Sequence, residues 1–355
     1  MKSLSVQEGK TVLPSVNQNF QKKFKKKKLS LTEYVEGIRC ADITILSQAI
    51  TLVESQNKSH QELAKQIVDA CIPYAGNSTR IGITGVPGVG KSTFIESFGM
   101  KCLDEGKKLA VLAIDPSSER TGGSILGDKT RMETLSVQKN VFIRPSPSIG
   151  SLGGVARKTR ETMLLCEAAG FDTIIVETVG VGQSETHVHS MVDVFLLLLL
   201  AGAGDELQGI KRGIMEMGDI LAITKADGSN KDKAVLAQQD VKNALHLFPP
   251  TDTGWIPRVL TCSSLHKEGI DELYHSISEF IRHMISKGFF KKKREVQSLQ
   301  HLEETIKDHL LRDFFTSMKE DISASKMRIV EGKSLSHYEA DTLLERYKSL
   351  KQSLS

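Results

Sequence analysis

The residues from Gly85 to Thr93 combine glycines, a lysine and hydroxyls at a spacing that suits phosphate chemistry. The stretch from Gly85 to Ser92 matches the template G-x-x-x-x-G-K-S/T. Its glycines allow the backbone to turn N–H groups inward around a phosphate. Lys91 would reach the β- and γ-phosphates as a point charge, Ser92 would bind Mg²⁺, and Thr93 would support the turn. The predicted nucleotide contacts here are Gly85, Val86, Pro87, Gly88, Val89, Gly90, Lys91, Ser92 and Thr93.

A glycine-rich turn with an accidental Lys-Ser pair is the alternative interpretation of this stretch. An apolar run at 80–84, the loop and the start of a helix occur in the order that the template requires, which favours the phosphate loop.

Carboxylates that follow apolar segments are candidates for the metal shell. Asp115 ends the segment 109–114 and could hold Mg²⁺ directly or through water, although Asp-Pro also suits a simple turn. Asp128 lies in a glycine-rich stretch that could close over the metal or the attacking water. Glu177, where Asp is commoner, ends the segment 173–177 and would contact the Mg²⁺ shell.

Gly180 follows Glu177 at a distance that suits a nucleotide switch, because its N–H would sense the γ-phosphate and release the loop upon hydrolysis. The predicted catalytic residues are Lys91, Asp128, Glu177 and Gly180, and the predicted metal ligands are Ser92, Asp115, Asp128 and Glu177.

A second motif, Thr224-Lys225-Ala226-Asp227, follows the apolar segment 219–224 and has the form of a guanine-reading sequence. The Asp227 carboxylate would accept hydrogen bonds from guanine N1–H and the exocyclic amine, donors that adenine does not offer in that arrangement. The Lys225 stem would lie over the base. The segment 257–262 leads to three residues whose backbone N–H groups would contact the guanine carbonyl: Ser263, Ser264 and Leu265.

His187 and His189 form a His-x-His pair after the second switch. We expect them to have a helix-surface or packing role, because no third metal ligand is evident nearby.

Apolar segments alternate with longer helical patterns between residues 80 and 286. Such alternation predicts an α/β fold with a mostly parallel sheet and helices on both faces. The carboxyl ends of the strands then form the ligand-binding edge, where the motifs fall. The predicted strands are 80–84, 109–114, 141–144, 173–177, 192–200, 219–224 and 257–262, and the predicted helices are 91–103, 155–169, 206–217, 231–247 and 269–286.

Helical extensions are predicted on both sides of this domain. Ile43, Leu46, Ile50 and Val53 recur at helical spacing, and Ser59 with Glu62 has the capping-box spacing for a second helix that runs to Cys71. Beyond residue 287, a segment rich in charge and leucine predicts two helices, 294–318 and 334–352, which pack on another subunit or fold back.

The predicted domains are a basic disordered tail at 1–30, a helical cap at 31–78, a nucleotide domain at 79–286 and a helical arm at 287–355. The lysine run in the tail indicates a solvated segment, with electrostatic contact to an acidic partner as the alternative.

Composition excludes several classes of protein. A hydrophobic fraction of 39% suits a soluble globular protein, and a net charge of +4 is too small to indicate a nucleic-acid partner. Five cysteines without close pairs argue against a disulfide framework. The most apolar run, 194–201, is far shorter than the roughly 20 residues of a membrane helix, and no signal-type segment opens the chain. We therefore expect a cytoplasmic protein without a membrane partner.

With these residues assembled, the chain resembles the MeaB/ArgK/MMAA family of P-loop GTPases. The stretches that carry the resemblance are 85–93, 113–118, 177–184 and 203–211. The resemblance implies a SIMIBI-type G domain that binds GTP or GDP with Mg²⁺. It implies a GTP-dependent chaperone that gates adenosylcobalamin loading or protection of methylmalonyl-CoA mutase or a related B12 mutase. It also implies that the 203–211 loop communicates with this client, and that the C-terminal helices form a homodimer.

One position departs from the family pattern. Thr224 stands where most members have Asn, so we expect weaker guanine affinity, whereas Asp227 is intact.

Two alternatives use the same phosphate loop. A kinase of the ArgK amino-acid-transport type would transfer phosphate to an acceptor, and nothing in these residues forms an acceptor site. A nickel-delivery GTPase would want a Cys and His cluster near the switches, where the sequence offers His187 and His189. Because Gln183 is not adjacent to Gly180, a group from the partner is expected to complete a slow GTPase.

Overall fold

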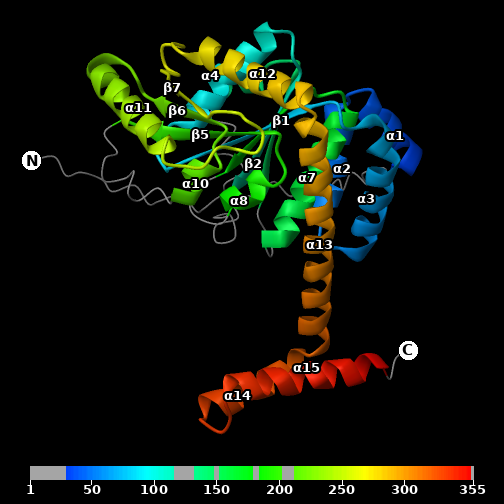
Figure 1. The fold of residues 1–355 in the computed structure, drawn as a ribbon. Coiled ribbons are helices and arrows are strands. Elements are labelled where there is room, and N and C mark those ends of the chain that lie inside the picture. The colour runs from blue at the N-terminus through cyan, green and yellow to red at the C-terminus, as the bar shows by residue number, and fades with distance from the viewer. Residues whose placement is uncertain (1–28, 116–131, 148–151, 179–183, 202–211, 353–355) are drawn as a thin grey trace, which may run out of the picture.

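The computed structural model describes residues 29–115, 132–147, 152–178, 184–201 and 212–352 (Figure 1). Within these ranges seven strands form one sheet in the order β3-β2-β4-β1-β5-β6-β7, and each neighbouring pair is parallel. The predicted α/β fold is therefore confirmed. The strands are β1 Thr79–Gly85, β2 Leu109–Asp115, β3 Val141–Pro147, β4 Thr173–Thr178, β5 Val194–Leu200, β6 Ile220–Thr224 and β7 Arg258–Thr261.

Both faces of the sheet are buried under helices, which explains why its strands are continuous apolar runs rather than alternating ones. Along β5, Leu196 and Leu198 pack under α4 and α12, whereas Leu197 and Leu199 pack with α10 and α11 on the other face. Helix α7 covers the β2–β4 part of that second face. The helices are α4 Lys91–Asp104, α6 Glu133–Ser136, α7 Leu152–Ala168, α8 Ser184–His189, α10 Arg212–Glu216, α11 Lys231–Leu245 and α12 Ile270–Ser286.

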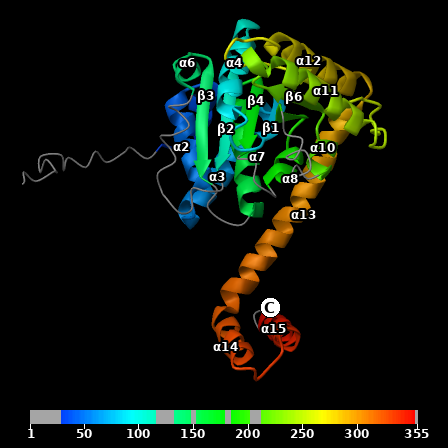
Figure 2. The same cartoon turned by 90° about the vertical axis from the view of Figure 1, so that its left-hand side faces the viewer.

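Three N-terminal helices pack outside α7: α1 Leu31–Arg39, α2 Ile43–Glu54 and α3 Lys58–Cys71 (Figures 1 and 2). The predicted capping box at Ser59 is wrong, because α3 begins one residue earlier and the Asn57 side chain accepts from the Ser59 N–H at 3.0 Å. A capping box does form at Ser30 and Glu33, before α1. Ile43, predicted on the apolar face of α2, is 40% exposed, because it occupies the first turn of the helix.

Residues 287–352 form three helices rather than the predicted two: α13 Phe289–Ser317, α14 Lys319–Val330 and α15 Ser336–Gln352. Helix α13 begins directly after Gly288, which has a φ of 75°. The break at Met318 has no Gly or Pro to signal it, and the Met318 side chain is fully buried. Helix α13 runs out of the body and carries α14 and α15 beyond it (Figures 1 and 2).

The first turns of α13 are fastened to the amino ends of the strands. Arg294 makes two hydrogen bonds with the Asp193 carboxylate, at 2.8 and 2.7 Å, and donates to the carbonyls of Gly76 and Ser78 at 2.6 Å. Gln297 donates to the Val192 carbonyl at 2.8 Å. These contacts lie at the edge of the sheet opposite the phosphate loop. They join the arm to the nucleotide domain.

No helix of the described ranges has the length and apolarity needed to cross a membrane.

Candidate functional site

The phosphate loop connects the carboxyl end of β1 to α4, in the centre of the sheet. Gly85 ends β1 beside β5, where an added Cβ would lie 2.5 Å from the Leu198 carbonyl oxygen. The backbone therefore passes closer to β5 than any other residue would allow. Gly90 precedes α4 with a φ of 93°, in the left-handed region that favours glycine. Helix α4 thus begins at Lys91 with its N–H groups at the loop.

Lys91 folds back over the loop that precedes it. Its Nζ donates to the Gly85 carbonyl at 2.7 Å and to the Val86 carbonyl at 3.3 Å. Burial lowers the pKa of Lys91, and the carboxylates of Glu177 and Glu185 oppose that shift. A cation thus stands at the mouth of the loop, near two acidic side chains. Ser92 and Thr93 follow in the first turn of α4, half-buried and exposed respectively.

Glu177 lies at the end of β4, next to the strand that leads into the phosphate loop. It is 8% exposed, and the neighbouring Thr178 hydroxyl donates to Thr84 Oγ1 at 2.8 Å, which joins the ends of β4 and β1. Glu185 in α8 is also buried, at 2% exposed. Sequence reasoning missed Glu185, because one acid at the start of a short polar helix resembles any exposed side chain.

The remaining predicted metal and switch residues are placed only in part. Asp115 is the last residue of β2, and the register of β2 with β4 pairs Ala113 with Glu177, so Asp115 lies at the same edge of the sheet. Asp128 and Gly180 lie outside the described residues, as does the predicted loop at 203–211. The roles assigned to these positions stay predictions.

The segment predicted to read guanine is attached directly to the phosphate loop. Thr224 ends β6 and is 2% exposed; its hydroxyl contacts the Val89 carbonyl at 2.8 Å and the Leu199 carbonyl at 3.2 Å. Lys225 is exposed, with a φ of 55°, and its Cε lies 3.9 Å from the position of a Cβ on Gly90. The motif and the loop, far apart in sequence, therefore form one continuous surface.

Asp227 is half-buried, and its carboxylate accepts a hydrogen bond from the Ser263 hydroxyl. The Ser263 N–H donates to the Glu268 carbonyl at 2.9 Å, so this residue reaches the site through its side chain rather than its backbone. Ser264 accepts from the Ser97 hydroxyl at 2.7 Å through its carbonyl, and Leu265 is 74% exposed. Ser263 therefore orients the carboxylate that was predicted to read the base.

The histidine pair lies on α8. The His189 ring packs edge-on against Phe195, with ring centroids 5.5 Å apart. Burial, with a smaller contribution from Lys293, lowers the pKa of His189 to about 4. The structure thus places His189 in a packing role, as expected.

A parallel sheet with a phosphate loop at its centre, and a TKxD segment pinned to that loop, defines a P-loop nucleotide-binding protein of the GTPase class. A family model described as "Methylmalonyl Co-A mutase-associated GTPase MeaB" matches residues 46–319. The chain therefore belongs to the MeaB family, and it is a GTPase.

Relatives of known name support this assignment. The chain is 50% identical to "GTPase ArgK" of Escherichia coli over 288 residues, covering 81% of this chain and 87% of that protein. It is 43% identical to the mouse "Methylmalonic aciduria type A homolog, mitochondrial" over 330 residues, covering 90% and 79%. A solved structure, "Crystal structure of LAO/AO transport system kinase", superposes with a TM-score of 0.72 at 40% identity and covers 90% of this chain and 97% of that chain.

Proposed function

We propose that this GTPase binds GTP with Mg²⁺ and uses hydrolysis to gate adenosylcobalamin loading or protection of methylmalonyl-CoA mutase or a related B12 mutase. The observation that carries the nucleotide assignment is the hydrogen bond from the Thr224 hydroxyl to the Val89 carbonyl. It fixes the base-reading segment against the phosphate loop, so that one ligand with a guanine and a phosphate chain spans both. The mutase assignment rests on the family that the chain belongs to.

The donor set at the phosphate end suits Mg²⁺. Ser92 offers a hydroxyl oxygen and Glu177 a buried carboxylate at the mouth of the loop, and magnesium prefers such hard oxygen ligands. Asp115 and Asp128 would complete the proposed shell. When bound, Mg²⁺ would supply positive charge to the phosphate oxygens as charge develops on them.

The residues of the chain have separate tasks in this proposal. Lys91 leaves the carbonyls of Gly85 and Val86 to pair with the β- and γ-phosphates. The N–H groups of the loop would hold the phosphates, and the Gly180 N–H would sense the γ-phosphate. Asp227, oriented by the Ser263 hydroxyl, accepts the two guanine donors. Loss of the γ-phosphate would then release the segment after Glu177.

The arm provides the proposed dimer contact. Large apolar side chains recur along α13 on the part that extends beyond the body, and exposed apolar surface of this kind marks an interaction site. They are Leu299 (64% exposed), Leu302 (57%), Ile306 (49%), Leu310 (58%) and Phe315 (57%). Helices α14 and α15 are joined by Arg328, which donates to Glu339 at 2.8 Å and holds the pKa of that carboxyl at about 2. A homodimer through this arm and a cytoplasmic location remain proposals.

The nucleotide assignment is tested by measuring hydrolysis of GTP and ATP by the unmutated protein and by Asp227→Ala. A hydrogen bond to a charged group contributes about 1.5–3 kcal/mol, so the variant should lose about tenfold or more of its preference for GTP. The γ-phosphate should appear as free phosphate. Equal hydrolysis of ATP and GTP by the unmutated protein would contradict the guanine assignment, and phosphate transferred to an acceptor would indicate a kinase.

The client assignment needs its own experiment. Purified methylmalonyl-CoA mutase should be retained by the immobilised protein, with an amount that differs between GDP and a non-hydrolysable GTP analogue. Equal retention in both states would contradict nucleotide-dependent gating while leaving the GTPase assignment intact.

A further inference from the structure

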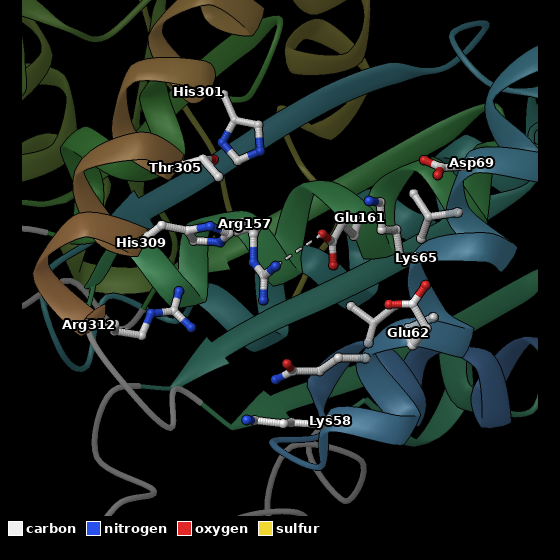
Figure 3. A pocket seen from close by; sticks show the side chains of 14 residues that line it. Lys58, Glu62, Lys65, Asp69, Arg157, Glu161, His301, Thr305, His309 and Arg312 are labelled. Carbon is white, nitrogen blue, oxygen red and sulfur yellow. Dashed lines mark ion pairs between the residues drawn. The ribbon is translucent and has the colours of Figure 1, made fainter. Parts of the chain in front are cut away.

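A cavity of about 670 Å³ lies between α3, α7 and α13, and Figure 3 shows the side chains that line it. None of the lining residues belongs to the phosphate loop or to the guanine-reading segment. The volume lies within the range of about 300–1,000 Å³ that is typical of small-molecule sites. The proposed function does not use this cavity.

Nitrogen-bearing side chains gather at one end of the cavity. Arg157 comes from α7, and His301, His309 and Arg312 come from α13 (Figure 3). Burial lowers the pKa of Arg312, and the positive charge of Arg157 adds to that effect. The two guanidinium groups are therefore close enough to repel each other. Arg312 pairs with Asp308 on its own helix, and an anion between the two guanidinium groups would relieve the repulsion that this pair leaves.

Two polar atoms at this end of the cavity also lack hydrogen-bond partners in the described part of the chain. Within the described residues, Arg157 Nε and His301 Nδ1 are buried and make no hydrogen bond. A buried polar atom left unpaired is destabilising, so both atoms favour a ligand that pairs with them. Arg157 contacts Glu161 at 3.9 Å, near the limit for an ion pair, which leaves room for a closer anion.

The other end of the cavity, toward α3, carries acidic as well as basic side chains. Helix α3 contributes Glu62 and Asp69 together with Lys58 and Lys65 (Figure 3). Glu161 lies between the two ends, and burial raises the pKa of its carboxyl. Carboxylates accept hydrogen bonds from hydroxyl or amine groups. The cavity thus offers anion contacts toward α13 and hydrogen-bond acceptors toward α3.

We propose that this cavity binds a small phosphorylated metabolite, with its phosphate against Arg157, Arg312, His301 and His309 and its hydroxyl or amine groups against Glu62 and Asp69. Arginine suits this role because its planar group pairs with two phosphate oxygens at once. Since α13 carries the arm and α7 covers the sheet, such a ligand would connect the arm to the nucleotide domain. This proposal does not depend on the identity of the mutase.

The test is calorimetric titration of the full chain with ribose 5-phosphate at saturating GDP, so that the phosphate loop is occupied. Ribose serves as the probe without phosphate. We expect ribose 5-phosphate to bind and ribose not to bind. Arg312→Ala should weaken binding by about tenfold or more, because a hydrogen bond to a charged group is lost. His309→Ala, at an exposed position that leaves the fold undisturbed, should weaken it as well.

The matched control is Lys307→Ala, which removes an exposed cation of α13 that does not line the cavity. Its affinity should stay within about twofold of the unmutated protein, since a distant exposed charge is screened. The proposal is overturned if ribose 5-phosphate does not bind at millimolar concentration, or if Arg312→Ala and His309→Ala bind it as well as Lys307→Ala does. It is also overturned if these variants change only the oligomeric state, which would make the cavity a contact between subunits. GTP hydrolysis by Arg312→Ala reports separately on the nucleotide site.

Discussion

Replacement of Thr224 by valine removes one hydroxyl and keeps the shape of the side chain. In the structure this hydroxyl contacts the Val89 carbonyl at 2.8 Å and so links the segment predicted to read guanine to the phosphate loop. Thr224 is 2% exposed, so water does not easily replace the lost donor. We expect Thr224→Val to bind guanine nucleotides more weakly, because the loop is no longer held in the binding conformation.

The size of the effect follows from the burial. A buried hydrogen bond contributes about 1 kcal/mol, and a carbonyl left without its partner raises the loss toward about 2 kcal/mol. If this free energy lowers the fraction of molecules whose loop is in the binding conformation, the apparent dissociation constant for GDP rises by roughly 5- to 30-fold.

Fluorescent GDP binding measures this change directly. The matched control is Thr159→Val, which removes the hydroxyl of another buried threonine, one that donates to the Val155 carbonyl within α7 at 2.9 Å. This control should bind GDP normally and lose less stability, because the Val155 carbonyl keeps its helical N–H partner. If Thr224→Val binds GDP with unchanged affinity, or if both variants weaken binding equally, the contact with the loop does not position the nucleotide site.

Three further perturbations test other parts of the molecule. Lys91→Ala should abolish GTP turnover in a phosphate-release assay. An unchanged rate of GTP hydrolysis would contradict a role for Lys91 in the catalytic site. Arg294→Ala leaves the buried Asp193 carboxylate without its charged partner, so urea unfolding should show a loss of about 3 kcal/mol, whereas the exposed Arg346→Ala should lose under about 1 kcal/mol. Because burial lowers the pKa of His189 to about 4, the unfolded chain binds a proton between pH 6.5 and 4 that the folded chain does not. The free energy of unfolding should therefore fall as pH drops from 6.5 to 4, and it should fall less in His189→Gln. Identical pH profiles for the variant and the unmutated protein would contradict the lowered pKa of His189.

Local patterns in the sequence determined most of the elements. The seven strands were predicted because each is a short apolar run that ends in a turn signal. The phosphate loop was predicted from the spacing of its glycines, and Gly85 and Gly90 do have the positive φ angles that glycine adopts readily. The predictions that were wrong also concerned local features of single helices. Ser59 and Glu62 have the spacing of a capping box, but Asn57 is an equally good cap and begins the helix earlier. The break at Met318 has no sequence signal.

What the sequence by itself determined is therefore the identity of the elements and of the motifs, since these depend on neighbours a few residues apart. Only the tertiary structure decided that Thr224 holds Val89, that Ser263 orients Asp227, and that Glu185 lies buried near Lys91. These contacts join residues far apart in the chain. They follow from the order and register of parallel strands, which spacing along the sequence does not encode.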